Sequence, residues 1–448
     1  MKKVFTAVLM LTLCFAAAGF GQAKKWQFLK VFPDTTRTFS TTGVHGLSVD
    51  PEGKVWIGGF GASDSVLSGG VQKTVVTVQV FKADGTPASF SPIKMVTIGA
   101  TTDTLFSAKS IRGMRTGADG NVTFAHLDTY YKINYKTGAG IAKVKPSAAS
   151  LTAPAFTSAN EMFSAHVAGG NPIEIWDANF GPLGVAVASS VNFSRTLEVS
   201  KDGNDIYWCG YTGKPITKYH SDLGTLGPYA VVDSFAFGCF VESTSWNKKD
   251  GYLYASSGPI DTINYGVIPA PWKPETWYGF NVTTKKAMDS IVWNQSAYRY
   301  GYGKLGEPVV GVDLVPRPRA IDFSPTGDTA YIACYNYQKA PVQMFVRVNA
   351  ASVEPVSNEL PGNYTLSQNY PNPFNPSTEI VFALPKAGFT TVKVYDVVGK
   401  EVATLVNEEL GVGTFKTTLD GSRLSSGTYI YSLTSGSTHI SKKMMLVK

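Results

Sequence analysis

The sequence predicts an all-β protein with two folded parts: a β-propeller of six or seven blades, and a small Ig-like β-sandwich that follows it. Three observations support this prediction. Only 16% of the 448 residues are charged, whereas 12% are aromatic and 44 are glycine, a composition that favours strands joined by tight turns. A strand–turn–strand pattern recurs through the middle of the chain. Short alternating segments, separated by Gly, Pro and Asn, fill roughly the last ninety residues.

The first residues have the features of an export signal. Lys2 and Lys3 precede an apolar run of seventeen residues, 4–20, and the small residues of a cleavage site follow at 21–23. Seventeen residues are short for a helix that crosses a membrane. We therefore expect residues 1–23 to be a signal peptide, and the mature chain to pass through the periplasm without a transmembrane segment.

Residues 24–352 are expected to form the propeller. A short apolar strand, a turn and an aromatic-rich strand recur in six copies, with turns at Gly53, Gly120, Asn160, Gly203, Gly251 and Gly327. Three of the five intervals are 40 to 48 residues, the period of four-stranded blades. The intervals of 67 and 76 residues require insertions, and the second has room for a seventh blade. Residues 26–32 are expected to pair with the last blade, because an open ring would leave an unpaired strand edge.

Two of these turns also carry a resemblance. The segments DPEGKVWIG at 50–58 and SPTGDTAYIA at 324–333 resemble turns of the NHL, gluconolactonase-like and YVTN propeller families. The resemblance covers the turns only, and it implies a fold rather than an activity because one fold hosts many functions.

The last part of the chain carries four motifs: NYPNPFNPST at 369–378, VYDVVGKEV at 394–402, SGTYIY at 426–431 and KKMMLVK at 442–448. Together they closely resemble the C-terminal type A sorting domain of type IX secretion cargo, over roughly residues 357–448. We expect a linker at 353–360 and an Ig-like sorting domain at 361–448. The resemblance implies that the type IX secretion machinery is a partner, and that the product is extracellular or on the outer cell surface.

One position of the repeat collects basic side chains. Eight residues before each turn position, the copies have His45, Arg112, Thr152, Arg195, Ser243 and Arg319. This position begins the innermost strand, which lines the channel of a propeller. Three guanidinium groups on a rigid ring would bind a carboxylate, sulfate or phosphate. Alternatively, each arginine pairs locally with an acid, and Glu198 and Asp322 are the candidates because they lie three residues further along two of these strands.

We interpret the propeller as a binding protein for an anionic small molecule or polysaccharide at the mouth of the channel. One alternative is a hydrolase or lyase acting on an anionic sugar or lactone there, which would need an acid–base pair such as His45 with Glu198. Another is a structural surface protein or adhesin that binds through outer loops. No metal-ligand spacing of Cys and His occurs, and we expect no metal, cofactor or catalytic residue. The net charge of +7 includes no basic block, which argues against a nucleic-acid partner.

Overall fold

The computed structural model describes residues 26–34, 39–146, 150–211, 214–258, 271–294, 317–335, 342–347, 354–357, 361–422 and 424–448. The expected signal peptide at 1–23 lies outside these ranges. The chain divides into two compact units, one at 25–348 and the other containing 349–448. Apart from the short 3-10 helix η1 (Gly224–Leu226), the regular elements of the described residues are all strands. Within these ranges, no helix has the length and apolar character needed to cross a membrane.

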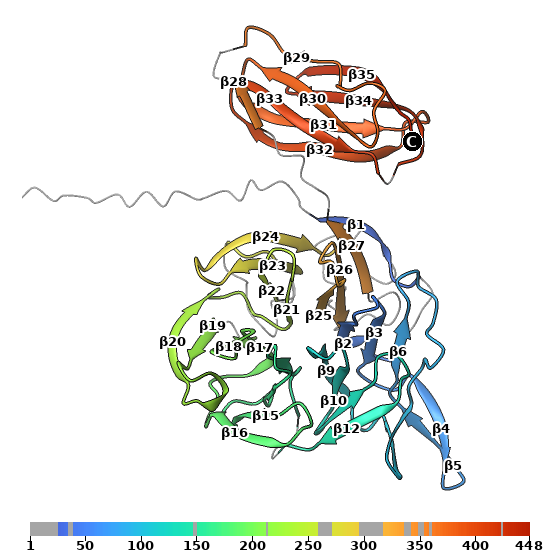
Figure 1. Ribbon diagram of the computed structural model, residues 1–448, viewed down its shortest axis with the longest axis vertical. Coiled ribbons are helices and arrows are strands. Elements are labelled where there is room, and N and C mark those ends of the chain that lie inside the picture. The colour runs from blue at the N-terminus through green and yellow to red at the C-terminus, as the bar shows by residue number, and fades with distance from the viewer. Residues whose placement is uncertain are drawn as a thin grey trace, which may run out of the picture. The chain divides into compact units, whose positions relative to one another are not determined.

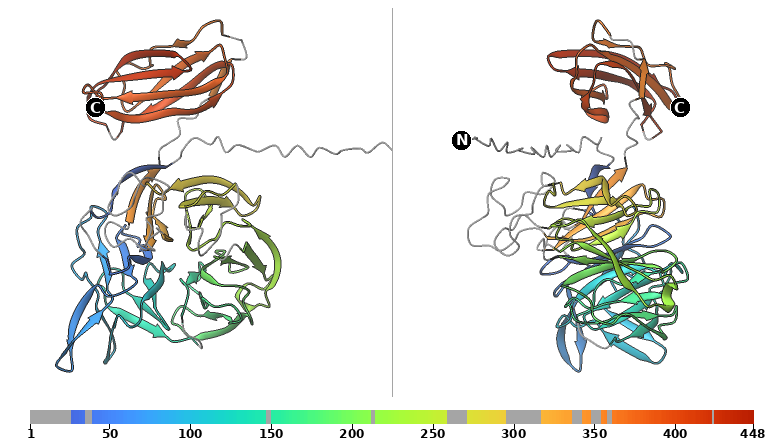
Figure 2. Two further views of the ribbon diagram at one scale, coloured as in Figure 1. Left: turned by 180° about the vertical axis from the view of Figure 1, so that it is seen from behind. Right: turned by 90° about the vertical axis from the view of Figure 1, so that its left-hand side faces the viewer.

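Six sheets surround a central axis in the first unit (Figures 1 and 2). With strands given from the inside outward, the first blade is β2 (Val44–Val49), β3 (Val55–Gly59) and β6 (Val78–Phe81), and the second is β9 (Ile111–Thr116), β10 (Val122–His126), β11 (Thr129–Ile133) and β12 (Gly140–Val144). The third is β13 (Ala155–Phe156), β14 (Met162–Ser164), β15 (Ile173–Trp176) and β16 (Pro182–Val187), and the fourth is β17 (Ser194–Val199), β18 (Asp205–Gly210), β19 (Ile216–His220) and β20 (Ala230–Phe235). The fifth is β21 (Thr244–Trp246), β22 (Leu253–Ser256), β23 (Thr276–Asn281) and β24 (Lys286–Val292), and the sixth contains β25 (Arg317–Phe323), β26 (Thr329–Tyr335) and β27 (Val342–Arg347). The described residues therefore form a six-bladed β-propeller.

The predicted turn positions explain the repeat. Each lies between the first and second strands of its blade, and all six have a left-handed backbone, with φ of 64° at Asn160 and 71° to 82° at the five glycines. Glycine and asparagine are the residues that adopt this conformation most readily. The degenerate third copy therefore keeps the geometry of the turn with a different residue.

The ring is closed by the N-terminal strand, as predicted. Strand β1 (Trp26–Val31) pairs antiparallel with β27 and completes the sixth blade. The Trp26 indole donates to Asp289 at 3.0 Å and to the Tyr254 hydroxyl at 3.2 Å, which ties this blade to the fifth. The first long interval contains two hairpins, β4 (Asp64–Ser68) with β5 (Val71–Val75) and β7 (Met95–Ile98) with β8 (Thr101–Thr104). In the second interval, the described strands belong to the fifth and sixth blades, and the rest lies outside the described residues.

The second unit is a sandwich of two four-stranded sheets. One has the order β28-β33-β30-β29 and the other β32-β31-β34-β35. Their bounds are β28 (Glu354–Ser357), β29 (Thr365–Leu366), β30 (Ser377–Leu384), β31 (Gly388–Tyr395), β32 (Glu401–Leu410), β33 (Gly413–Asp420), β34 (Gly427–Ser435) and β35 (Thr438–Leu446). The expected linker at 353–360 therefore needs correction, because residues 354–357 form β28 and pair with β33. A proline-containing segment suits an edge strand, where its missing N–H costs no ladder bond.

Candidate functional site

Four inner strands have an irregular register at the predicted basic position. The pairing of β2 with β3 shifts between Val44 and Gly46, so that His45 is the extra residue. The pairings of β9 and β25 shift in the same way at Arg112 and Arg319. In β17 the shift spans the segment that contains Arg195. A β-bulge bends its strand and redirects a side chain, so these shifts account for four basic side chains that face one space.

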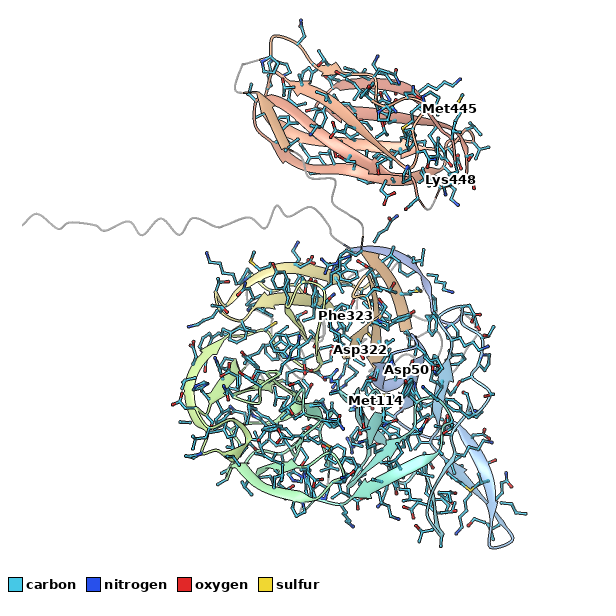
Figure 3. All side chains as sticks on the ribbon, viewed as in Figure 1. Asp50, Met114, Asp322, Phe323, Met445 and Lys448 are labelled. Atoms are coloured by element: carbon cyan, nitrogen blue, oxygen red, sulfur yellow. The ribbon has the colours of Figure 1, made fainter. Side chains whose placement is uncertain are left out.

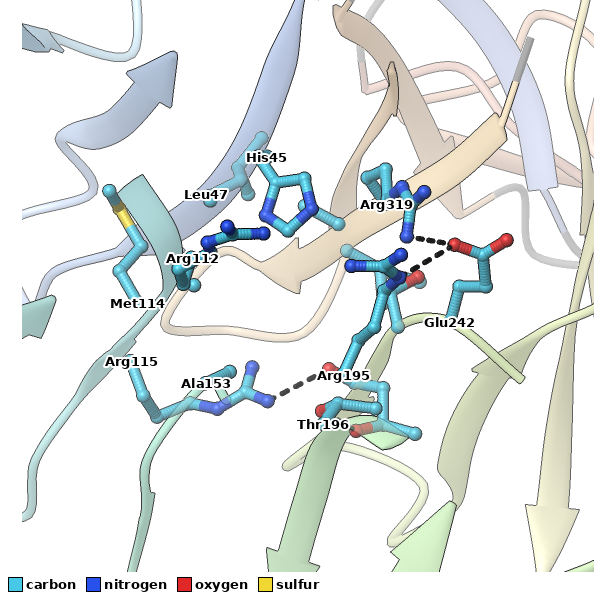
Figure 4. Close-up of a pocket in the computed structure, with 16 residues that line it drawn as sticks. His45, Leu47, Arg112, Met114, Arg115, Ala153, Arg195, Thr196, Glu242 and Arg319 are labelled. Carbon is cyan, nitrogen blue, oxygen red and sulfur yellow. Dashed lines mark hydrogen bonds and ion pairs between the residues drawn. The ribbon is translucent and has the colours of Figure 1, made fainter. Parts of the chain in front are cut away.

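These side chains line one cavity between the inner strands (Figure 4). Ser243 lines it as well. Thr152 does not belong to the lining, and its hydroxyl donates to the backbone carbonyl of Ala153 at 3.0 Å. We call His45, Arg112, Arg195 and Arg319, together with the neighbouring Glu242, the arginine layer.

Each guanidinium group of the arginine layer lies over an aromatic ring. The guanidinium carbons of Arg112, Arg195 and Arg319 are 5.0, 4.7 and 5.1 Å from the ring centroids of Phe60, Tyr211 and Tyr335. These rings stand at or just after the ends of β3, β18 and β26. Stacking fixes the orientation of a guanidinium group and leaves the N–H groups at its edge available for hydrogen bonds.

Charge in the arginine layer is unevenly compensated. The buried Glu242 carboxylate lies 3.4 Å from Arg195 Nε and also forms an ion pair with Arg319 (Figure 4). Within the described part of the chain, Arg112 has no carboxylate partner. Burial, and then the nearby charge of Arg195, lower the pKa of Arg112. The layer therefore contains three guanidinium groups and a single carboxylate among the described residues.

The predicted local ion pairs of Arg195 with Glu198 and of Arg319 with Asp322 are not formed. Glu198 pairs with Arg115 of β9 and accepts a hydrogen bond from the Thr244 hydroxyl at 3.1 Å. Glu198 therefore pairs with an arginine of another blade and not with the arginine of its own strand.

Asp322 belongs to a second set of polar groups, which also contains Arg115 and Glu198. It accepts hydrogen bonds from the Val49 amide at 2.8 Å, the Ser48 hydroxyl at 3.0 Å and the Ser245 hydroxyl at 2.8 Å. Figure 3 shows it near the centre of the propeller. Arg115 also donates to the carbonyl of Thr244 at 2.9 Å. We call Arg115, Glu198 and Asp322, with Ser48, Val49, Thr244 and Ser245, the paired layer.

His45 completes the arginine layer as a neutral group. Its ring is buried beside Phe60 and Tyr335, with centroid distances of 5.1 and 6.0 Å. Burial, and then the charges of the three arginines, hold the pKa of His45 well below its ordinary value. The acid–base pair of His45 with Glu198 is not formed, because Glu198 is held by Arg115 and Thr244. The described residues include no cluster of three or more His, Cys, Asp or Glu side chains suited to a metal ion.

Sequence reasoning missed two charged residues at the cavity, Arg115 and Glu242. Arg115 lies three residues after Arg112, and the same three-residue step that identified Glu198 could have found it. Glu242 precedes β21 and so falls outside the strand used to align the repeat. The aromatic residues under the guanidinium groups could have been predicted from the repeat, because each follows the turn glycine of its copy by seven or eight residues.

Comparison with known proteins identifies the second unit. Residues 368–448 match the family described as "Secretion system C-terminal sorting domain". Together with the four motifs, this match makes the C-terminal unit a sorting domain of the type IX secretion system. Such a domain directs export to the cell surface or the extracellular space.

Comparison of the whole chain gives similarities of fold at low sequence identity. No curated protein matches the chain. Similar solved structures include the WD40 β-propeller domain of Doa1, with 11% identity, a TM-score of 0.40, and coverage of 72% of this chain and 99% of that chain. The Cps50 (Swd1) β-propeller domain of Myceliophteria thermophila has 9% identity, a TM-score of 0.41, and coverage of 70% and 99%. PorZ, a surface component of the type IX secretion system of Porphyromonas gingivalis, has 13% identity, a TM-score of 0.37, and coverage of 90% and 51%.

Proposed function

We propose that this exported propeller binds an anionic ligand in the cavity of the arginine layer. The observation that carries the proposal is Arg112, a partly buried guanidinium group stacked on Phe60 and without a carboxylate partner in the described part of the chain. Removing a charge from water is costly unless an opposite charge compensates it. A bound anion would supply that compensation.

The charge balance around the cavity supports the same proposal. Among the described residues, the lining contains four guanidinium groups and one carboxylate, Glu242. Glu198 neutralises Arg115 from the paired layer. Asp322 adds a third carboxylate from the paired layer, so among the described residues four cations stand against three anions, while His45 is held neutral. A cavity with this excess attracts anions.

The site is also organised before a ligand arrives. The shifted register positions fix the backbone of the arginine layer, and the three aromatic rings fix the planes of its guanidinium groups. Because little side-chain freedom remains to be lost, most of the interaction energy is available for affinity.

The test uses the mature chain, residues 24–448, at constant ionic strength. Small carboxylates, sulfate, phosphate and acidic oligosaccharides are screened by thermal shift, and Kd is measured for each compound that stabilises the protein. Arg112→Met removes the charge but keeps a side chain over Phe60. Lys201→Met, at an exposed turn position outside the cavity, is the control matched in charge.

We expect wild type and Lys201→Met to be stabilised by the same anions, and Arg112→Met to bind them at least about tenfold more weakly, the loss of one charge-assisted hydrogen bond. A folded wild type that responds to no anion would refute the proposal and favour a surface protein or adhesin acting through its outer loops. Turnover of a bound acidic sugar or lactone would instead establish the hydrolase or lyase alternative.

A further inference from the structure

The four motifs of the sorting domain meet at one end of its sandwich. Tyr395 of the second motif pairs with Ile430 of the third, and Ile430 pairs with Lys443 of the fourth. In the first motif, the Phe374 amide donates to the carbonyl of Met445 at 2.9 Å. Figure 3 labels Met445 at this end of the unit. We give the name motif end to the surface formed by residues 370–376, 395–400, 427–430 and 443–448.

Exposed apolar side chains gather at the motif end. Among the described residues of the second unit, eight large hydrophobic side chains are at least 41% exposed. Two of them, Phe389 and Val412, lie at the opposite end of the sandwich. The other six belong to the motif end: Tyr370, Val397, Val398, Ile430, Met445 and Val447. Single exposed apolar side chains are ordinary on a protein surface, whereas a group of them marks an interaction site.

The turn between β31 and β32 contributes the two most apolar positions of this surface. The Asp396 carboxylate accepts hydrogen bonds from the amides of Val398 and Lys400 at 3.0 and 2.9 Å, and Gly399 has a φ of 83°. This arrangement fixes the turn and leaves Val397 and Val398 70% and 83% exposed. Exposed turn positions are ordinarily occupied by polar residues or by Gly and Pro, so two valines are unusual here.

The same turn occurs in the propeller without apolar side chains. The Asp50 carboxylate accepts hydrogen bonds from the amides of Glu52 and Lys54 at 3.0 and 2.9 Å, and Gly53 has a φ of 79°. The places of the two valines are taken by Pro51 and Glu52, both of which are exposed. Because this backbone forms equally with polar residues, the fold does not require the two valines of the sorting domain.

Basic side chains accompany the apolar ones. Lys400, Lys443 and Lys448 are exposed, and none of them forms an ion pair with a carboxylate of the described residues. The neighbouring carboxylates of Asp396 and Asp420 accept hydrogen bonds from backbone amides. Lysines around an apolar centre are complementary to a protein surface that has an apolar recess and carboxylates beside it.

We propose that the motif end is the surface through which the sorting domain binds a protein of the type IX secretion machinery. Val397 and Val398 enter an apolar recess of that protein, and the three lysines face its carboxylates. The match to the sorting family covers residues 368–448 and therefore contains the whole motif end, which makes the export machinery the partner for this surface. The inference does not depend on the anion site of the propeller.

The test compares two double variants of the full chain, residues 1–448, in a bacterium that has a type IX secretion system. Val397→Pro/Val398→Glu installs the residues that the same turn has in the propeller, so the turn itself is kept. Phe389→Thr/Val412→Glu is the control, since it removes the two exposed apolar side chains of the opposite end and adds the same charge. The initial rate of export is followed by pulse-chase, with an antibody against the propeller.

We expect the control to be exported at the rate of wild type, within about twofold. Val397→Pro/Val398→Glu should be exported at least about tenfold more slowly and should accumulate in the periplasm, because the burial of two valines against the partner is lost. Lys400→Glu/Lys443→Glu keeps the apolar side chains and should slow export by about threefold, through repulsion of the carboxylates of the partner.

Export of the valine variant at the wild-type rate would overturn the proposal, and so would equal losses in the valine variant and in the control. Circular dichroism of the purified variants shows whether each is folded. If the valine variant is unfolded, the lysine variant decides, since export of that variant at the wild-type rate would contradict the basic contact. Sedimentation of the mature chain tests another occupant: a dimer that the valine variant abolishes without a change in export would assign the surface to a second copy.

Discussion

Strands β9 and β17 each contribute an arginine to the arginine layer, Arg112 and Arg195, and a charged residue three positions later to the paired layer. In the paired layer, Arg115 and Glu198 neutralise each other across the channel, and Thr244 provides further hydrogen bonds. In the arginine layer, by contrast, Arg112 has an aromatic ring beneath it and no carboxylate partner among the described residues.

The difference suggests what each layer is for. The ion pair and hydrogen bonds of the paired layer join residues of different blades, and such a buried network contributes to the choice of one fold. The arginine layer, in which the charge of Arg112 is not compensated by a carboxylate of the described chain, is poorly suited to stabilise the fold and well suited to bind an anion. We therefore expect substitutions in the paired layer to change stability, and substitutions in the arginine layer to change binding.

The largest effect is expected from Arg115→Met. It leaves Glu198 as a buried carboxylate without its ion pair, and breaking such a pair costs roughly 3–5 kcal/mol. Protonation of Glu198, whose pKa burial already raises, would relieve part of this cost, so we expect about 3 kcal/mol. Urea unfolding followed by tryptophan fluorescence measures it in the propeller alone, because all tryptophans precede residue 294. A loss below about 1 kcal/mol would contradict the structural role of the paired layer.

Glu242→Gln should have the next largest effect. It removes the carboxylate that lies between Arg195 and Arg319 and leaves the arginine layer with cations only among the described residues. We expect a destabilisation of about 2 kcal/mol in a buffer without binding anions. An anion that occupies the cavity should restore most of it, and should bind the variant more tightly than wild type. Destabilisation that no anion reverses would show that Glu242 acts on the fold alone.

The pH dependence of stability should differ between wild type and His45→Phe. The folded pKa of His45 lies well below its unfolded value, near 6.5, so the unfolded chain binds more protons as pH falls below that value. Stability contributed by neutral His45 is therefore present above pH 6.5 and lost toward lower pH, by up to about 1.4 kcal/mol per unit. The difference between the two unfolding free energies, measured from pH 7.5 to 5, should show this slope. Parallel curves would mean that His45 is not kept neutral.

The smallest change in stability is expected from Arg112→Met. Since this substitution removes a partly buried charge that has no carboxylate partner in the described chain, unfolding without ligand should change by less than about 1 kcal/mol, in either direction. Lys201→Met provides the reference for loss of an exposed charge. A loss of several kcal/mol would reveal a structural role for Arg112 and erase the contrast between the layers.

The sequence predicted the repeat, the ring closure and the place where the basic residues meet. This was possible because a left-handed turn requires Gly or Asn, and a fixed distance from that turn puts residues at the same height of each inner strand. The partners of Arg195 and Arg319 were mispredicted, since counting along a strand says nothing about which residue reaches across the channel. Glu242 comes from a segment without the repeat pattern. Strand β28 was taken for a linker because an edge strand and a linker share a polar, proline-containing composition.

The central claim is that Arg112 serves a ligand rather than the fold. The most direct measurement is the free energy of unfolding of wild type and Arg112→Met at constant ionic strength, as the concentration of the anion that stabilises the protein most in the thermal-shift screen is raised. We predict similar values without the anion, followed by a rise for wild type that follows RT ln(1 + [L]/Kd) and a flat line for the variant. Two lines that rise together, or two that stay flat, would contradict the claim.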